Sequence, residues 1–252
     1  MRIYKIAFRN PLDMATNILS RKLLQAVIKL TDQGRLNQRG NWIIETNAKY
    51  KGFGDEIKIV IHLNVVEKYM IPPFSINAQY SSLNLSPYAL LTTNTEDISH
   101  NKKLEIWMNF SILFSKKFYN DLYGYIVNAI RHELEHMKQD EERMVRKHPK
   151  DYDANTLTTE KDLIKSFDER SKYLSSAFEQ EPWIRGFMLQ CKKEKVSLGD
   201  ALIDFIHQTL FLNDTETEKR IKNVVGLKAE HIEQILYKLY MDRAKKIFPK
   251  MQ

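Results

Sequence analysis

The residues whose types and spacing could do chemistry are His132, Glu133 and His136, which form the pattern His-Glu-x-x-His. Residues four apart on an α-helix lie on one face, one turn above the other, so both imidazoles can reach a single cation. Glu133 lies beside them and can accept a proton from a water molecule that the cation polarises. This layout is typical of a zinc-dependent hydrolase and predicts a metal site with Glu133 as general base.

The same pattern could also occur by chance on a solvated helix face, but the surrounding sequence favours a metal site. Upstream, apolar residues recur at three- and four-residue steps, which predicts an amphipathic helix that runs through the core. These residues are Leu122, Tyr125, Ile126, Ala129, Ile130, Leu134 and Met137. Residues 138–143 are charged or polar, so we expect the helix to reach solvent just after His136.

The elements that must position this helix can be predicted from hydrophobic periodicity. We expect a strand-like start over 1–9, an irregular segment over 72–87 with possible short extended pieces, and a mobile loop over 148–161. Helices are predicted over 12–31, 163–174, 178–194, 197–212 and 229–248, and strands over 42–46, 56–65 and 103–110. The order of elements predicts an α+β lobe, then an α-helical lobe, with a cleft between them.

Composition excludes several other classes of site. The chain has 252 residues, with 43% hydrophobic and 28% charged residues, as in ordinary globular proteins. The net charge is +7, but the basic residues are spread along the chain, which does not favour nucleic-acid binding. We find neither an apolar leader nor a membrane-spanning run, and Cys191 is the single cysteine. We therefore expect a cytoplasmic protein without a membrane partner, whose metal is bound by histidine and carboxylate groups.

A catalytic zinc usually needs a third protein ligand, and four later residues are candidates: Glu179, Glu181, His207 and His231. The sequence around the first two reads Tyr173-Leu174-Ser175-Ser176-Ala177-Phe178-Glu179-Gln180-Glu181-Pro182-Trp183-Ile184-Arg185-Gly186. Together with the histidine motif, this segment resembles the gluzincin clan of metallopeptidases, in particular small zinc peptidases encoded by phages and bacteria. In many of those, the metal helix is followed by tyrosine-leucine-serine and then by E-x-E-A-(aromatic). The resemblance covers roughly residues 100–190.

The resemblance implies an α+β, zincin-like fold, with residues 1–145 ending in the metal helix and residues 146–252 forming the helical lobe. It implies Zn²⁺ held by His132, His136 and Glu179. Glu181 stays open as an alternative because Pro182 stands where the family usually has alanine.

A metallopeptidase also needs a group that stabilises the oxyanion, and Tyr173 is the first candidate and Arg185 the second. In a zincin-like fold, the strand over 104–110 would be an edge that binds extended peptide. Expected partners are a peptide or protein substrate and, if the chain is phage-encoded, other virion proteins. The alternative is a structural or adaptor protein, such as a virion component, that keeps this fold without turnover.

Overall fold

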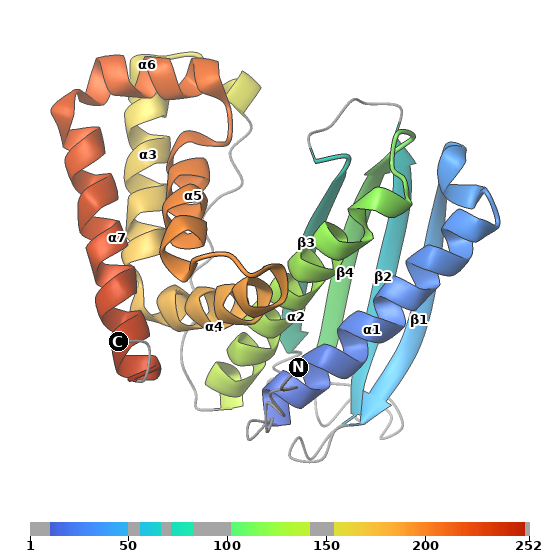
Figure 1. Cartoon of the computed structure of the whole chain (residues 1–252). Coiled ribbons are helices and arrows are strands. Elements are labelled where there is room, and N and C mark those ends of the chain that lie inside the picture. The colour runs from blue at the N-terminus through green and yellow to red at the C-terminus, as the bar shows by residue number, and fades with distance from the viewer. Residues whose placement is uncertain (1–10, 50–55, 67–71, 83–101, 142–153, 250–252) are drawn as a thin grey trace, which may run out of the picture. The chain divides into compact units, whose positions relative to one another are not determined.

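The computed structural model describes residues 11–49, 56–66, 72–82, 102–141 and 154–249 (Figure 1). Within these residues the chain forms seven α-helices and one four-stranded mixed sheet, which confirms the α+β class. The chain divides into two compact units, Met1–Glu142 and Arg143–Gln252. The predicted strand over 1–9 lies outside the described residues.

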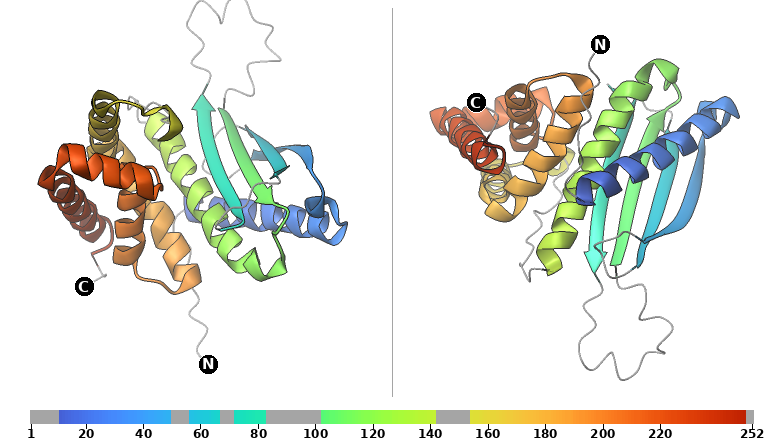
Figure 2. Two further views of the ribbon diagram at one scale, coloured as in Figure 1. Left: turned by 90° about the horizontal axis from the view of Figure 1, so that it is seen from above. Right: turned by 60° about the horizontal axis from the view of Figure 1, so that its bottom comes forward.

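The first unit is a mixed sheet with two helices on one of its faces (Figure 2). The strand order is β1-β2-β4-β3; β1 and β2 are antiparallel, β2 and β4 are parallel, and β4 and β3 are antiparallel. The elements, in chain order, are α1 (Pro11–Asp32), β1 (Gly40–Lys49), β2 (Glu56–Val66), β3 (Phe74–Ser82), β4 (Lys102–Ser111) and α2 (Tyr119–Glu141).

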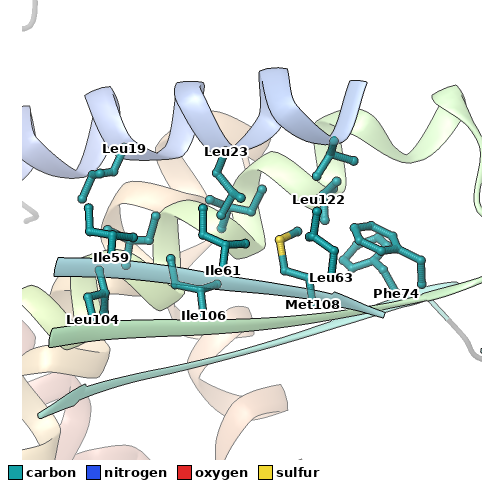
Figure 3. Packing of buried hydrophobic residues seen from close by; sticks show 14 of the residues in the cluster. Leu19, Leu23, Ile59, Ile61, Leu63, Phe74, Leu104, Ile106, Met108 and Leu122 are labelled. Atoms are coloured by element: carbon teal, nitrogen blue, oxygen red, sulfur yellow. The ribbon is translucent and has the colours of Figure 1, made fainter. Parts of the chain in front are cut away.

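The core of this unit lies between the sheet and its two helices (Figure 3). Successive side chains of a strand point to opposite faces, so alternate residues of β2 and β4 supply the buried layer. Ile59 pairs with Leu104, and Ile61 pairs with Ile106, all of them buried. From α1, Leu23 and its neighbours one helical turn away pack onto this layer. The strands expected over 42–46, 56–65 and 103–110 and the helix over 12–31 are confirmed, with ends a few residues longer.

Two predictions for this unit are wrong. The segment over 72–87 was expected to be irregular with possible short extended pieces, but Phe74–Ser82 form one continuous strand, β3; residues 83–87 lie outside the described part of the chain. Apolar residues at 74, 76 and 78 alternate with polar ones at 75, 77 and 79, so β3 has the period of a half-buried strand, and the two prolines before it obscured that signal. The strand over 104–110 was expected to be an edge, but β4 is paired on both sides, with β2 and with β3. The edge beside β4 is β3.

The second unit is helical throughout its described residues. It contains α3 (Glu160–Ser175), α4 (Ala177–Glu194), α5 (Leu198–Phe211), α6 (Thr215–Val225) and α7 (Leu227–Ile247). The four predicted helices are confirmed. Helix α6 was not predicted because it is short and mostly polar; its start is fixed by Asp214, whose side chain accepts a hydrogen bond from the Thr217 backbone N–H.

The loop expected over 148–161 is only partly covered by the described residues, which begin again at 154. Glu160 and Lys161 belong to the first turn of α3, so the predicted loop is too long at this end. Thr159 and Asp162 form a capping box that starts the helix there. None of the described helices is both long and apolar enough to cross a membrane.

Candidate metal centre

Helix α2 carries the histidine motif on a stripe next to its core-facing stripe. Ile126, Ile130 and Leu134 are buried at four-residue steps in the core of the first unit, which fixes the rotation of the helix. His132 and His136 are also buried. Met137 is buried, as its place in the apolar stripe predicts, but residues 138–143 were expected to reach solvent and Gln139 is buried, so this prediction is wrong at Gln139.

The two histidine rings of α2 present the same nitrogen to each other. The Nε2 atoms of His132 and His136 are 3.0 Å apart, and the ring planes are nearly perpendicular, at 85°. Two nitrogen lone pairs repel each other at this separation unless a proton or a cation lies between them. The Glu133 Oε1 atom is 3.6 Å from His132 Nε2, and Glu133 is buried as well. Two imidazoles and one carboxylate therefore converge within a single helix.

Gln139 fixes the tautomer of His136. The Gln139 Oε1 atom is 2.8 Å from His136 Nδ1, and a carbonyl oxygen can only accept a hydrogen bond. His136 therefore carries its proton on Nδ1, which leaves the lone pair on Nε2 for a cation. Metal-binding histidines generally have their other ring nitrogen held in this way.

A buried ion network lies on another side of the same turn of α2. Arg131 is fully buried; its Nε donates to Asp13 Oδ1 at 2.8 Å, and its Nη1 donates to Glu135 Oε2 at 2.6 Å. Asp13 belongs to α1, so the network ties the two helices together. This network was not predicted from the sequence, although the spacing of Arg131 and Glu135 is that of an i, i+4 ion pair.

Glu179 lies in the second unit, in the first turn of α4, and it is buried. Its Oε2 atom accepts a hydrogen bond from the Tyr173 hydroxyl at 2.8 Å, and that hydroxyl accepts one from Trp183 Nε1 at 3.1 Å. Burial, and then the negative charge of Glu179, raise the pKa of Tyr173 well above its usual value. Tyr173 is therefore a neutral hydrogen-bond donor to the carboxylate.

Glu181, the alternative third ligand, is bound by two arginines. Its Oε1 accepts from Arg185 Nε and Nη2, at 2.9 and 2.6 Å, and its Oε2 accepts from Arg243 Nη2 at 3.1 Å. Burial acts to raise the pKa of Glu181, but both guanidinium groups outweigh it and hold the pKa below the usual range. A cation would have to compete with these arginines for Glu181. Arg185, the second candidate for oxyanion stabilisation, is engaged in the same pairs.

The other candidates have different surroundings. His207 lies between two carboxylates, with Nδ1 2.8 Å from Glu233 and Nε2 3.4 Å from Glu218. Because these carboxylates approach opposite ring nitrogens, the three groups cannot share one ion. His231 is exposed. Burial raises the pKa of the Cys191 thiol to about 11, so at neutral pH it is a neutral thiol and a poor nucleophile.

Comparison with known proteins gives no relative for this arrangement. No protein-family model, curated protein or solved structure matches the chain. The assignment of the predicted ligands therefore rests on the geometry of the described residues alone. His132 and His136 lie in α2, and Glu179 lies in α4.

Proposed function

We propose that the chain is a zinc-dependent metallopeptidase of gluzincin type, with a zincin-like fold. His132, His136 and Glu179 would hold the zinc ion, and Glu133 would be the general base. The observation that carries the proposal is the convergence of the two Nε2 atoms, 3.0 Å apart, beside the carboxylate of Glu133.

The types of donor atom suit zinc. His132, His136 and Glu179 are buried, and their nitrogen and oxygen atoms form a group that could hold a metal ion. Two imidazoles and one carboxylate are a common ligand set for catalytic zinc and leave one position open. The Nδ1 proton of His136, held by Gln139, supports this assignment because a histidine must be neutral at the ligating nitrogen. Glu181 is a weaker candidate because its oxygens already pair with arginines.

When bound there, zinc would polarise both a water molecule and the substrate carbonyl. Glu133 would accept a proton from the water molecule as the water oxygen attacks the carbonyl carbon of the substrate and forms the new C–O bond. The same carboxyl group would then donate that proton to the amine nitrogen as the C–N bond breaks.

Both β1 and β3 are edge strands of the sheet, and we propose that β3 is the edge that binds an extended peptide. β3 pairs with β4 on one side, and no other described strand pairs with it. Helix α2 packs against β3, so this edge lies beside the helix that carries the histidine motif. A peptide added to such an edge gains main-chain hydrogen bonds without requiring a particular sequence. We propose protein or peptide amides as the substrate class on this basis.

A cytoplasmic location, in the producing cell or in a host cell, is part of the proposal. It is supported by Cys191, a free and buried thiol. If the chain is part of a virion, other virion proteins would be its partners.

The first experiment measures bound metal by elemental mass spectrometry in the purified wild type, His136→Ala and Glu133→Gln. We expect about one zinc per chain in the wild type and in Glu133→Gln, and none in His136→Ala. Hydrolysis of a mixed fluorogenic peptide library should then occur with the wild type and not with Glu133→Gln. No zinc uptake by the wild type would refute the proposal. Zinc uptake without hydrolysis of any peptide or protein would favour the structural or adaptor role instead.

A further inference from the structure

Tyr173 and Glu179 meet because the backbone bends between α3 and α4. Ser176 has extended dihedral angles, φ −66° and ψ 124°, and it is both the C-cap of α3 and the N-cap of α4. The Tyr173 carbonyl accepts from the Ser176 N–H, and the Ser176 carbonyl accepts from the Gln180 N–H, so both helix ends at the bend are satisfied. The bend therefore brings Tyr173, in the last turn of α3, against Glu179, in the first turn of α4.

The direction of the hydrogen bonds in this cluster follows from chemistry alone. An indole N–H can only donate, so the Tyr173 oxygen accepts from Trp183. A carboxylate can only accept, so the Tyr173 proton points to Glu179 Oε2. Trp183 is itself held by aromatic packing, with Phe205 at 4.3 Å and Phe187 at 5.7 Å between ring centroids. The hydroxyl is thus fixed in position and in orientation.

We propose that Tyr173 is a positioning residue for the metal ligand Glu179, and not the group that stabilises the oxyanion. Its hydroxyl, held by Trp183, occupies Oε2 of the carboxylate, so that Oε1 is the atom presented to the cation. This inference rests on the proposed zinc site. It predicts that the hydroxyl acts on metal affinity, because a partner that orients a ligand typically contributes about 10- to 100-fold to metal binding.

Tyr240 of α7 provides a matched control. It is completely buried, and its hydroxyl has no hydrogen-bond partner among the described residues. Burial and then the charge of Glu179 raise its pKa well above the usual value, so it lies in the same electrostatic environment as Tyr173. Tyr173→Phe and Tyr240→Phe both remove one buried hydroxyl from the surroundings of Glu179. Only the first removes a hydrogen bond to the carboxylate.

The test is the zinc dissociation constant of the full chain, measured by competition with a chromogenic chelator. We expect Tyr173→Phe to raise the dissociation constant by about 10- to 100-fold, and Tyr240→Phe to change it by less than about threefold. Equal effects of the two variants, or an unchanged constant in Tyr173→Phe, would overturn the inference. If wild type binds no zinc, the proposed function fails and the inference fails with it; if wild type binds zinc normally, the inference alone is under test.

A second set of variants separates positioning from general structural support. In Glu179→Gln the ligand is already damaged, so adding Tyr173→Phe should weaken zinc binding by less than about threefold further. Full additivity of the two losses would overturn the inference. If Tyr173→Phe loses the far-UV circular dichroism of the wild type, Trp183→Phe replaces it, and a weaker zinc affinity is again required.

Peptide hydrolysis distinguishes positioning from oxyanion stabilisation. With excess zinc, Tyr173→Phe should reach most of the wild-type kcat, because a positioning defect lowers zinc affinity and excess zinc still fills the site. A kcat that stays at least 100-fold low at saturating zinc, with a normal zinc dissociation constant, would assign Tyr173 to the oxyanion.

Discussion

Replacing Arg131 by methionine should destabilise the protein strongly, although Arg131 is not a proposed ligand. Arg131 is fully buried between two carboxylates, those of Asp13 and Glu135. The Asp13 side chain is 28% exposed and would be solvated after the change, but the Glu135 side chain is only 2% exposed. Removing one partner of a buried pair leaves an uncompensated charge and typically costs about 3–5 kcal/mol. Lys138 Nζ lies 3.5 Å from Glu135 Oε1 and offsets part of the loss, which places the expected cost near 3 kcal/mol.

The assay is urea unfolding of the zinc-free full chain, followed by far-UV circular dichroism. With a denaturant slope of about 2 kcal/mol per molar, a loss of about 3 kcal/mol lowers the midpoint by about 1.5 M urea. The control is the double variant Arg131→Met, Glu135→Leu, which removes both buried charges and should recover most of the midpoint. A single variant within about 0.3 M of wild type, or a double variant no more stable than the single one, would refute this account of the network.

Three further predictions concern separate groups. Gln139→Leu should weaken zinc binding by about tenfold, because His136 loses the acceptor for its Nδ1 proton. Gln139→Glu keeps an acceptor and should bind zinc as the wild type does. Competition with a chelator measures both affinities. Burial raises the pKa of Cys191 to about 11. Its thiol should therefore react with a disulfide reagent at pH 8 at least 100-fold more slowly in the native protein than in urea, and equal rates would contradict its burial. Burial acts to raise the pKa of Glu181, but two arginines outweigh burial and lower it. The ion pairs of Glu181 therefore stabilise the protein above the usual glutamate pKa of about 4.5. That contribution is lost as pH falls through the lowered pKa. The gap in Tm between wild type and Glu181→Gln should therefore be largest near pH 7 and should narrow as the pH falls through and below the lowered pKa; a constant gap would argue against the pairing.

Much of the fold could be predicted from the sequence because most of its elements have a clear hydrophobic period. The apolar alternation of β2 and β4, and the three- and four-residue spacing in α2, are signals that burial on one face imposes directly. β3 has the same alternation, with Phe74, Ile76 and Ala78 between polar residues, but the two prolines before it favoured an irregular segment. Its pairing with β4 is long-range information, so nothing in the sequence corrected the expectation, taken from the family resemblance, that β4 is an edge strand when it is an interior one.

The candidate site shows the same division between local and long-range information. The histidine pair and Glu133 are local, since one helix turn places them together, and they could be predicted from spacing alone. The contact from Arg131 to Asp13 joins residues in two helices, and no sequence period encodes it. Tyr173 and Glu179 are close in sequence, but their hydrogen bond depends on the bend at Ser176, which helix periodicity does not predict.

Two of the three proposed ligands share one feature that a metal centre needs. His136 has its Nδ1 committed to Gln139, and Glu179 has its Oε2 committed to Tyr173, in each case to a residue of the same unit. These two ligands are therefore oriented by the folding of their own units, before any cation binds. Ordering a free side chain costs up to about 2 kcal/mol, and folding of each unit has already met that cost here. Substitutions at Gln139 and Tyr173 should consequently reduce zinc affinity more than they reduce the stability of the zinc-free protein. A loss of stability as large as the loss in binding energy would show that the two contacts serve packing alone.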